Sequence, residues 1–112
     1  MTGDCRDERL QPNEVPAVID RLRDEDPATR ESAVRRLASA CRPTDVVCAL
    51  TKCLGDEAPN VRAAAAEALG DLGKPAAGAV GDLTELIDDP DERVRRVAER
   101  AVVRIRARWR VP

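Results

Sequence analysis

One motif occurs three times in this chain: an aspartate, five intervening residues, and an arginine that opens an alanine-rich amphipathic stretch. The copies run from Asp24 to Arg30, from Asp56 to Arg62 and from Asp89 to Arg95, and they begin 32 and 33 residues apart. A period of this length is typical of solenoids, in which helical pairs stack one on the next. The sequence therefore predicts an all-α fold, an α-solenoid of about three helical hairpins with six helices.

Prolines divide the chain into segments of about one short helix each. A proline is tolerated in the first turn of a helix, where its missing N–H has no intrahelical partner, but it disrupts later turns. Each of six prolines is therefore expected near a helix start: Pro12, Pro27, Pro43, Pro59, Pro75 and Pro90. The predicted repeats span residues 12–42, 43–74 and 75–112 of one repeat domain. Residues 1–11 lack apolar periodicity and are predicted to be a flexible tail.

Apolar side chains recur at helical spacing within each segment, which predicts one buried face per helix. In the first helix of each pair they are Val15, Val18 and Leu22, then Val47, Leu50 and Leu54, then Val80, Leu83 and Ile87. In the second helix they are Thr29, Ala33, Leu37 and Ala40, then Val61, Ala65, Leu69 and Leu72, then Val94, Ala98, Val102 and Ile105. The chain has no Phe or Tyr and one Trp. Its core must therefore consist of closely packed small and aliphatic side chains. Gly78 and Gly81 should make the fifth helix the least stable.

Residues 56–73 resemble the second helix of a HEAT repeat, particularly the short repeats of bilin-lyase-like proteins. Residues 89–105 and 24–40 match the same pattern less closely, and the resemblance covers roughly residues 12–109. It implies a right-handed superhelix with the second helices on its concave side. It also implies an inter-repeat ladder, in which the Asp and Arg of the repeated motif are structural. The recurrence of one Asp/Arg couple per repeat independently favours such a ladder.

Most catalytic arrangements are excluded by composition. The chain contains no His, so Ser-His-Asp and Cys-His nucleophile systems and His-containing metal sites are ruled out. It also has no glycine-rich phosphate-binding motif. We therefore expect no enzymatic activity, no cofactor and no metal. No apolar run is long enough to span a membrane, and the first eleven residues lack a signal-peptide core, so a cytoplasmic protein is predicted.

The four cysteines show no C-x-x-C spacing, which makes a zinc site improbable. Cys41 and Cys53 fall on apolar helix faces and are expected in the core. Cys48 projects with polar neighbours and is the expected exposed thiol. A disulfide would require an oxidising compartment.

The last helix is strongly basic, with eight arginines and one acidic residue, Glu99, in residues 93–112. Two interpretations remain open: a patch for phosphate, nucleic acid or an acidic protein surface, or a solvated cap on the stack. Trp109 lies at the edge of the apolar stripe of this helix. It is interpreted either as a lid over the end of the core or as an anchor that a partner buries, so self-association through this end is plausible.

The function that best fits these observations is a small, non-enzymatic protein-binding module. Its predicted surface consists of second-helix residues opposite the core stripe: Glu31, Arg35, Glu67, Asp71, Arg96, Arg100 and Arg104. The first alternative is nucleic-acid or phosphate binding through the arginine-rich last helix, as in HEAT-like DNA-repair proteins. The second is an accessory role in bilin attachment, which rests on the resemblance alone.

Overall fold

The computed structural model describes residues 9–109, with Arg108 and Trp109 described by their backbone only. Within this range the α-helices are α1 (Val15–Asp20), α2 (Pro27–Leu37), α3 (Val47–Cys53), α4 (Pro59–Leu72), α5 (Val80–Glu85) and α6 (Glu92–Trp109). Short 3-10 helices accompany them: η1 (Pro12–Glu14), η2 (Arg21–Arg23), η3 (Pro43–Asp45), η4 (Lys74–Ala79) and η5 (Leu86–Asp88). The described residues contain no β-strand, only one isolated bridge between Leu10 and Ala40.

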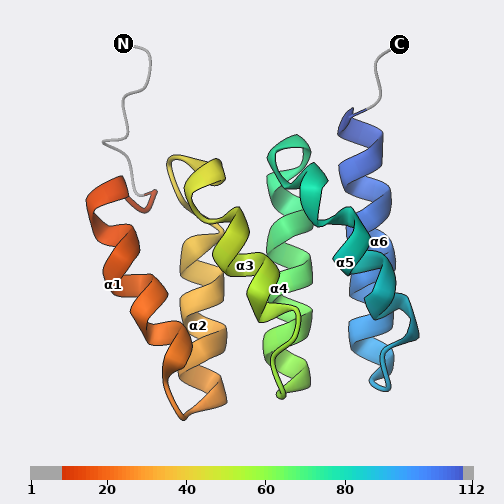
Figure 1. Cartoon of the computed structure of the whole chain (residues 1–112), viewed down its shortest axis with the longest axis horizontal. Coiled ribbons are helices and arrows are strands. Elements are labelled where there is room, and N and C mark those ends of the chain that lie inside the picture. The colour runs from red at the N-terminus through yellow and green to blue at the C-terminus, as the bar shows by residue number, and fades with distance from the viewer. Residues whose placement is uncertain (1–8, 110–112) are drawn as a thin grey trace.

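The helices form three hairpins that stack in series. In Figure 1, α2, α4 and α6 lie side by side as one layer, and α1, α3 and α5 form a second layer in front of them. Helix α4 lies between α2 and α6 and packs against both. This arrangement confirms the predicted all-α solenoid.

Local sequence explains where the second helices begin. Pro27 and Pro59 occupy the first turns of α2 and α4, where their missing N–H groups cost no hydrogen bond. The Asp26 carboxylate caps α2 by accepting the Ala28 N–H at 3.1 Å. Helix α4 ends at Leu72 and is followed by Gly73, whose φ of 72° is a backbone conformation that other residues rarely adopt.

The first helices differ from the prediction, because none is one continuous α-helix. Each combines a short α-helix with 3-10 turns, such as η4, α5 and η5 in the third repeat. Apolar residues spaced by three satisfy both helix types, so the pattern alone did not distinguish them. Gly78 consequently lies in η4, and only Gly81 lies in the α-helical part of this segment.

Alanine and glycine bring the second helices together, as the apolar stripes predicted. Val61, Ala65 and Leu69 of α4 are fully buried. A Cβ atom added at Gly70 would lie 3.0 Å from both Cα and Cβ of Ala101 in α6. The α4–α6 contact therefore depends on the absence of a side chain at this position.

The folded region begins earlier than predicted. Leu10, which was placed in the tail, is completely buried. Its N–H donates to the carbonyl of Ser39 at 2.9 Å, and its carbonyl accepts the N–H of Cys41 at 2.8 Å. Backbone pairing after α2 therefore holds this segment, a contact that periodicity could not reveal. Residues 1–8 lie outside the described range.

Two of the cysteines match the expectation and one does not. Cys48 is an exposed free thiol, and Cys53 is a buried free thiol. Burial raises the pKa of the Cys53 thiol to about 11, with a smaller contribution from the charge of Asp56. Cys41 is half-buried and disulfide-bonded rather than a free core thiol.

None of the helices in the described part of the chain is both long and apolar enough to cross a membrane.

Candidate functional site

The repeated motif forms a ladder that links successive repeats. Arg30 donates from Nε and Nη2 to the two carboxylate oxygens of Asp56, at 2.9 and 3.0 Å. Arg62 binds Asp89 of the next repeat in the same way, at 2.9 and 3.1 Å. Each arginine thus pairs with the aspartate of the following repeat, and the fork-to-fork geometry fixes their relative position.

The same arginines also bind their own loops. The Nη1 group of Arg62 donates to the carbonyl oxygens of Asp56 and Glu57, at 2.7 and 3.1 Å. Arg30 makes the equivalent pair of bonds to Asp24 and Glu25. Each guanidinium therefore holds together a loop of its own repeat and a carboxylate of the next.

The surroundings of the ladder residues favour the charged forms of Asp89 and Arg30. Burial by itself would raise the pKa of Asp89, which is 7% exposed. The hydrogen bonds from Arg62 and from the Asp91 N–H, with the charges of Arg62 and Arg95, outweigh burial and lower that pKa. The hydrogen bond to Asp56 likewise raises the pKa of Arg30.

The ladder is open at both ends within the described residues. Arg95 binds the carbonyls of Asp89 and Pro90 through Nη1, but its Nε and Nη2 groups have no protein acceptor in the described range. The carboxylate of Asp24 at the other end accepts only the Asp26 N–H among the described donors. No repeat in the described range supplies the missing partners.

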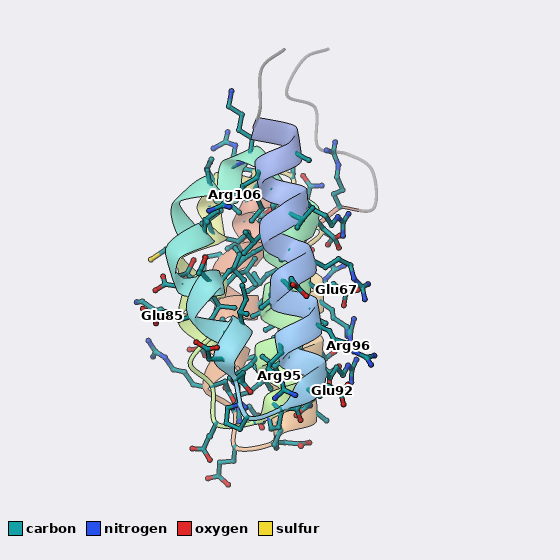
Figure 2. The ribbon with its side chains drawn as sticks, turned by 90° about the vertical axis from the view of Figure 1, so that its right-hand side faces the viewer. Glu67, Glu85, Glu92, Arg95, Arg96 and Arg106 are labelled. Carbon is teal, nitrogen blue, oxygen red and sulfur yellow. The ribbon has the colours of Figure 1, made fainter. Side chains whose placement is uncertain are left out.

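The predicted binding residues lie together on α2, α4 and α6. We call this set the second-helix face: Glu31, Arg35, Glu67, Asp71, Arg96, Arg100 and Arg104. Figure 2 shows Glu67 and Arg96 on the same side of the molecule, opposite Glu85 of the first-helix layer. The structure thus brings these residues to one side of the stack, as the helical spacing indicated.

Ion pairs tie this face together across the helices. Arg35 of α2 approaches Glu67 of α4 at 3.8 Å, and Asp71 of α4 binds Arg104 of α6 at 2.7 Å. Within α2, Arg35 also binds Glu31 one turn earlier at 2.8 Å. The face is therefore an ordered array of alternating charges.

Two participants in this array were missed from the sequence. Asn60 donates from Nδ2 to Glu31 at 2.8 Å, and Glu92 pairs with Arg96 at 3.0 Å. The Glu92/Arg96 spacing of four residues is a known signal for such a pair. The Asn60 contact crosses between repeats, so only the repeat register could have indicated it. The bonds from Asn60 and Arg35 lower the pKa of Glu31.

Arg100 is the cation of this face that remains available. It is exposed and has no ion-pair or hydrogen-bond partner among residues 9–109. With Glu67, Gly70 and Arg104 it lines a small hollow between α4 and α6. A carboxylate of a partner could bind here without displacing an existing pair.

The remaining predicted residues are on α6 or outside the described residues, and the charge of Arg93 helps to lower the pKa of Glu31. Arg93 and Arg106 are exposed on α6. The side chain of Trp109 lies outside the described residues, so neither interpretation of it is tested. In the part of the chain that the structure describes, no cluster of His, Cys, Asp and Glu could hold a metal ion.

A separate groove of about 430 Å³ lies on the first-helix side, between α1 and α3. Ile19, Leu22 and Ala49 supply apolar contacts, and Cys48 and Lys52 supply polar groups. Asp45 and Asp56 also line it, but the carboxylate of Asp56 is bound to Arg30, and burial raises the pKa of the Cys53 thiol.

Comparison with known proteins agrees with the geometry of the stack. A sequence model of HEAT repeats matches residues 15–103, which include all six α-helices in whole or in large part. Among curated proteins, none matches the chain.

Proposed function

Because the chain belongs to the HEAT-repeat family over more than half of its length, we propose that it is a non-enzymatic scaffold that binds another protein through the second-helix face. HEAT repeats commonly serve as protein-interaction scaffolds. The observation that carries the proposal is the ordered array of alternating charges that joins α2, α4 and α6, with Arg100 left available.

The charge pattern of this face favours a protein partner. Helix α4 contributes the acidic Glu67 and Asp71, and α6 contributes the basic Arg96, Arg100 and Arg104. A protein surface of mixed charge can complement both signs and so gain specificity. A nucleic-acid backbone is uniformly negative and would be repelled by the α4 carboxylates.

The basic helix is also less available to phosphate than its composition suggests. Arg96 and Arg104 are already paired with Glu92 and Asp71. No aromatic side chain that could stack a base is described beside them. Nucleic-acid binding is therefore the alternative, and the crosslinking experiment below must distinguish it from protein binding.

Site-specific photo-crosslinking in cells tests the proposal. A photoreactive amino acid is placed at Glu67 or Arg100 on the second-helix face, and at Glu85 on the opposite side as the control (Figure 2). We expect Glu67 and Arg100 positions to crosslink to the same protein and the Glu85 position not to. Equal crosslinking from all three positions, or crosslinks to nucleic acid alone, would reject the proposed face.

A charge deletion measures the contribution of the face once the partner is known. Arg100→Ala should weaken binding about tenfold or more if Arg100 receives a partner carboxylate. It breaks no described hydrogen bond or ion pair, so helicity and thermal stability should not change. Arg106→Ala removes an exposed arginine on the side of α6 away from Glu67 and Arg96 (Figure 2) and should leave binding intact.

A further inference from the structure

We propose that the two open ends of the ladder bind each other between copies, so that the Arg95 end of one molecule receives the Asp24 end of a second. The resulting contact is head to tail. The two residues that form its ion pair, Arg95 and Asp24, lie at the ends of the stack and are not part of the second-helix face, so the proposal is independent of the proposed scaffold function.

Arg95 is held in position for a carboxylate that the described residues do not provide. Its Nη1 group donates to the carbonyls of Asp89 and Pro90, at 2.8 and 3.1 Å. Arg62 has the same two anchors and uses its remaining donors for a bidentate bond to Asp89. The side chain of Arg95 is thus oriented as Arg62 is, and its Nε and Nη2 donors remain available to a second molecule.

Asp24 has the conformation that such a carboxylate would need. Its Oδ1 atom accepts the N–H of Asp26 at 2.8 Å. Asp56 and Asp89 each accept the N–H two residues further on, at 2.9 Å, while also binding an arginine. The carboxylate of Asp24 therefore matches those of the two paired aspartates but binds no arginine side chain among the described residues.

Each end of the stack also carries one charged residue at a repeat position where the other two repeats have a buried apolar residue, and the two charges are of opposite sign. Glu99 is exposed on α6 at the repeat position where Val34 and Ala66 are buried. Arg36 is exposed on α2 at the repeat position where Ala68 and Ala101 are buried.

The repeat register places Arg36 and Glu99 about one helical turn apart between stacked copies. Ala66 lies one turn from Gly70, and Gly70 meets Ala101. Because Gly70 corresponds to Val103 and Ala101 to Arg36, a second copy stacked in the same register would place its Arg36 against Val103, one turn from Glu99. Each end thus offers a charge of the opposite sign to the other.

The same register also brings together groups that weaken this contact. Arg35 approaches Glu67 between the first two repeats, so between copies Arg100 would approach Arg35. Val103, which is 61% exposed, occupies the repeat position of Gly70 and keeps the helices further apart. We therefore expect a weak contact that salt weakens further. Because it is heterologous, it should extend into longer chains of molecules rather than close as a dimer.

Sedimentation velocity of the full chain over about a hundredfold range of concentration tests the proposal. The wild type should form species larger than a dimer as concentration rises. Asp24→Asn and Arg95→Gln should each weaken association on the order of tenfold or more. Glu25→Gln and Arg93→Gln remove the same charges from neighbouring exposed positions and should associate as the wild type does.

Mixing the two variants gives the decisive result. Asp24→Asn retains the Arg95 end, and Arg95→Gln retains the Asp24 end. An equimolar mixture should therefore form complexes of two chains and nothing larger. Circular dichroism checks that each variant is folded, and Arg95→Lys replaces Arg95→Gln if the latter is not. A wild type that stays monomeric, variants that associate like the wild type, or a mixture no more associated than its components would overturn the proposal.

Discussion

Removing one Arg–Asp pair of the ladder should destabilise the whole stack, and the pair of Arg62 with Asp89 is the most informative one to remove. Arg62→Met deletes four described hydrogen bonds, two to Asp89 and two to the loop carbonyls of Asp56 and Glu57. It also leaves the carboxylate of Asp89, which is 7% exposed, without its cation. Breaking a buried ion pair from one side costs about 3 to 5 kcal/mol. Because Arg62 remains partly accessible to water, we expect a loss near the lower end, about 2 to 4 kcal/mol.

Arg95→Met is the matched control, because Arg95 makes the loop bonds but lacks the bidentate aspartate among the described residues. Its expected cost is about 1 kcal/mol. Urea denaturation followed by circular dichroism at low protein concentration measures both values. The Arg62 variant should also melt roughly 10 °C or more below the wild type. A double-mutant cycle with Asp89→Asn should give a coupling of about 1 kcal/mol or more. Equal costs for the two arginine variants, or a coupling near zero, would refute the role assigned to the ladder.

Three further predictions follow from local features. The pKa of Asp89 is lowered in the folded protein, so the contribution of Asp89 to stability is complete above its unfolded pKa of 3.8 and is lost as pH falls through the lower folded value. The urea midpoints of the wild type and of Asp89→Asn should therefore converge at this low pH. A constant difference between the two midpoints at every pH would contradict this. Gly70→Ala should lower the free energy of unfolding by about 1 to 3 kcal/mol through overpacking against Ala101. Gly81→Ala adds a Cβ that meets nothing within 4 Å and should raise the free energy of unfolding by up to about 1 kcal/mol. Equal melting temperatures for the two variants would contradict the described packing. Cys48 should react with maleimide in the native protein and Cys53 only after unfolding, as mass spectrometry of labelled peptides can show.

The second helices were predictable because their side-chain pattern is set by burial against both neighbours. Val61, Ala65 and Leu69 repeat at helical spacing, and all three are fully buried. The recurrence of Asp and Arg likewise indicated a ladder. The register of the ladder, with Arg30 bound to Asp56 of the next repeat rather than to Asp24, required the geometry of stacking.

Features that depend on contacts between distant segments could not be predicted. Leu10 is held by backbone bonds to Ser39 and Cys41, and backbone bonds leave no side-chain pattern in the sequence. The first helices were assigned as continuous because apolar spacing fits both 3-10 and α geometry. The second-helix face was predicted from helical spacing, but the contact of Asn60 with Glu31 across the repeats was not.

The serial stack on which the account depends is tested most directly by nuclear Overhauser effects in solution. The account predicts a strong cross-peak between the Ala101 methyl group and the Hα protons of Gly70, because the two helices touch at this point. It also predicts contacts from α4 to both α2 and α6. Absence of the Gly70–Ala101 cross-peak, or a set of contacts that packs α2 directly against α6 in place of α4, would contradict it.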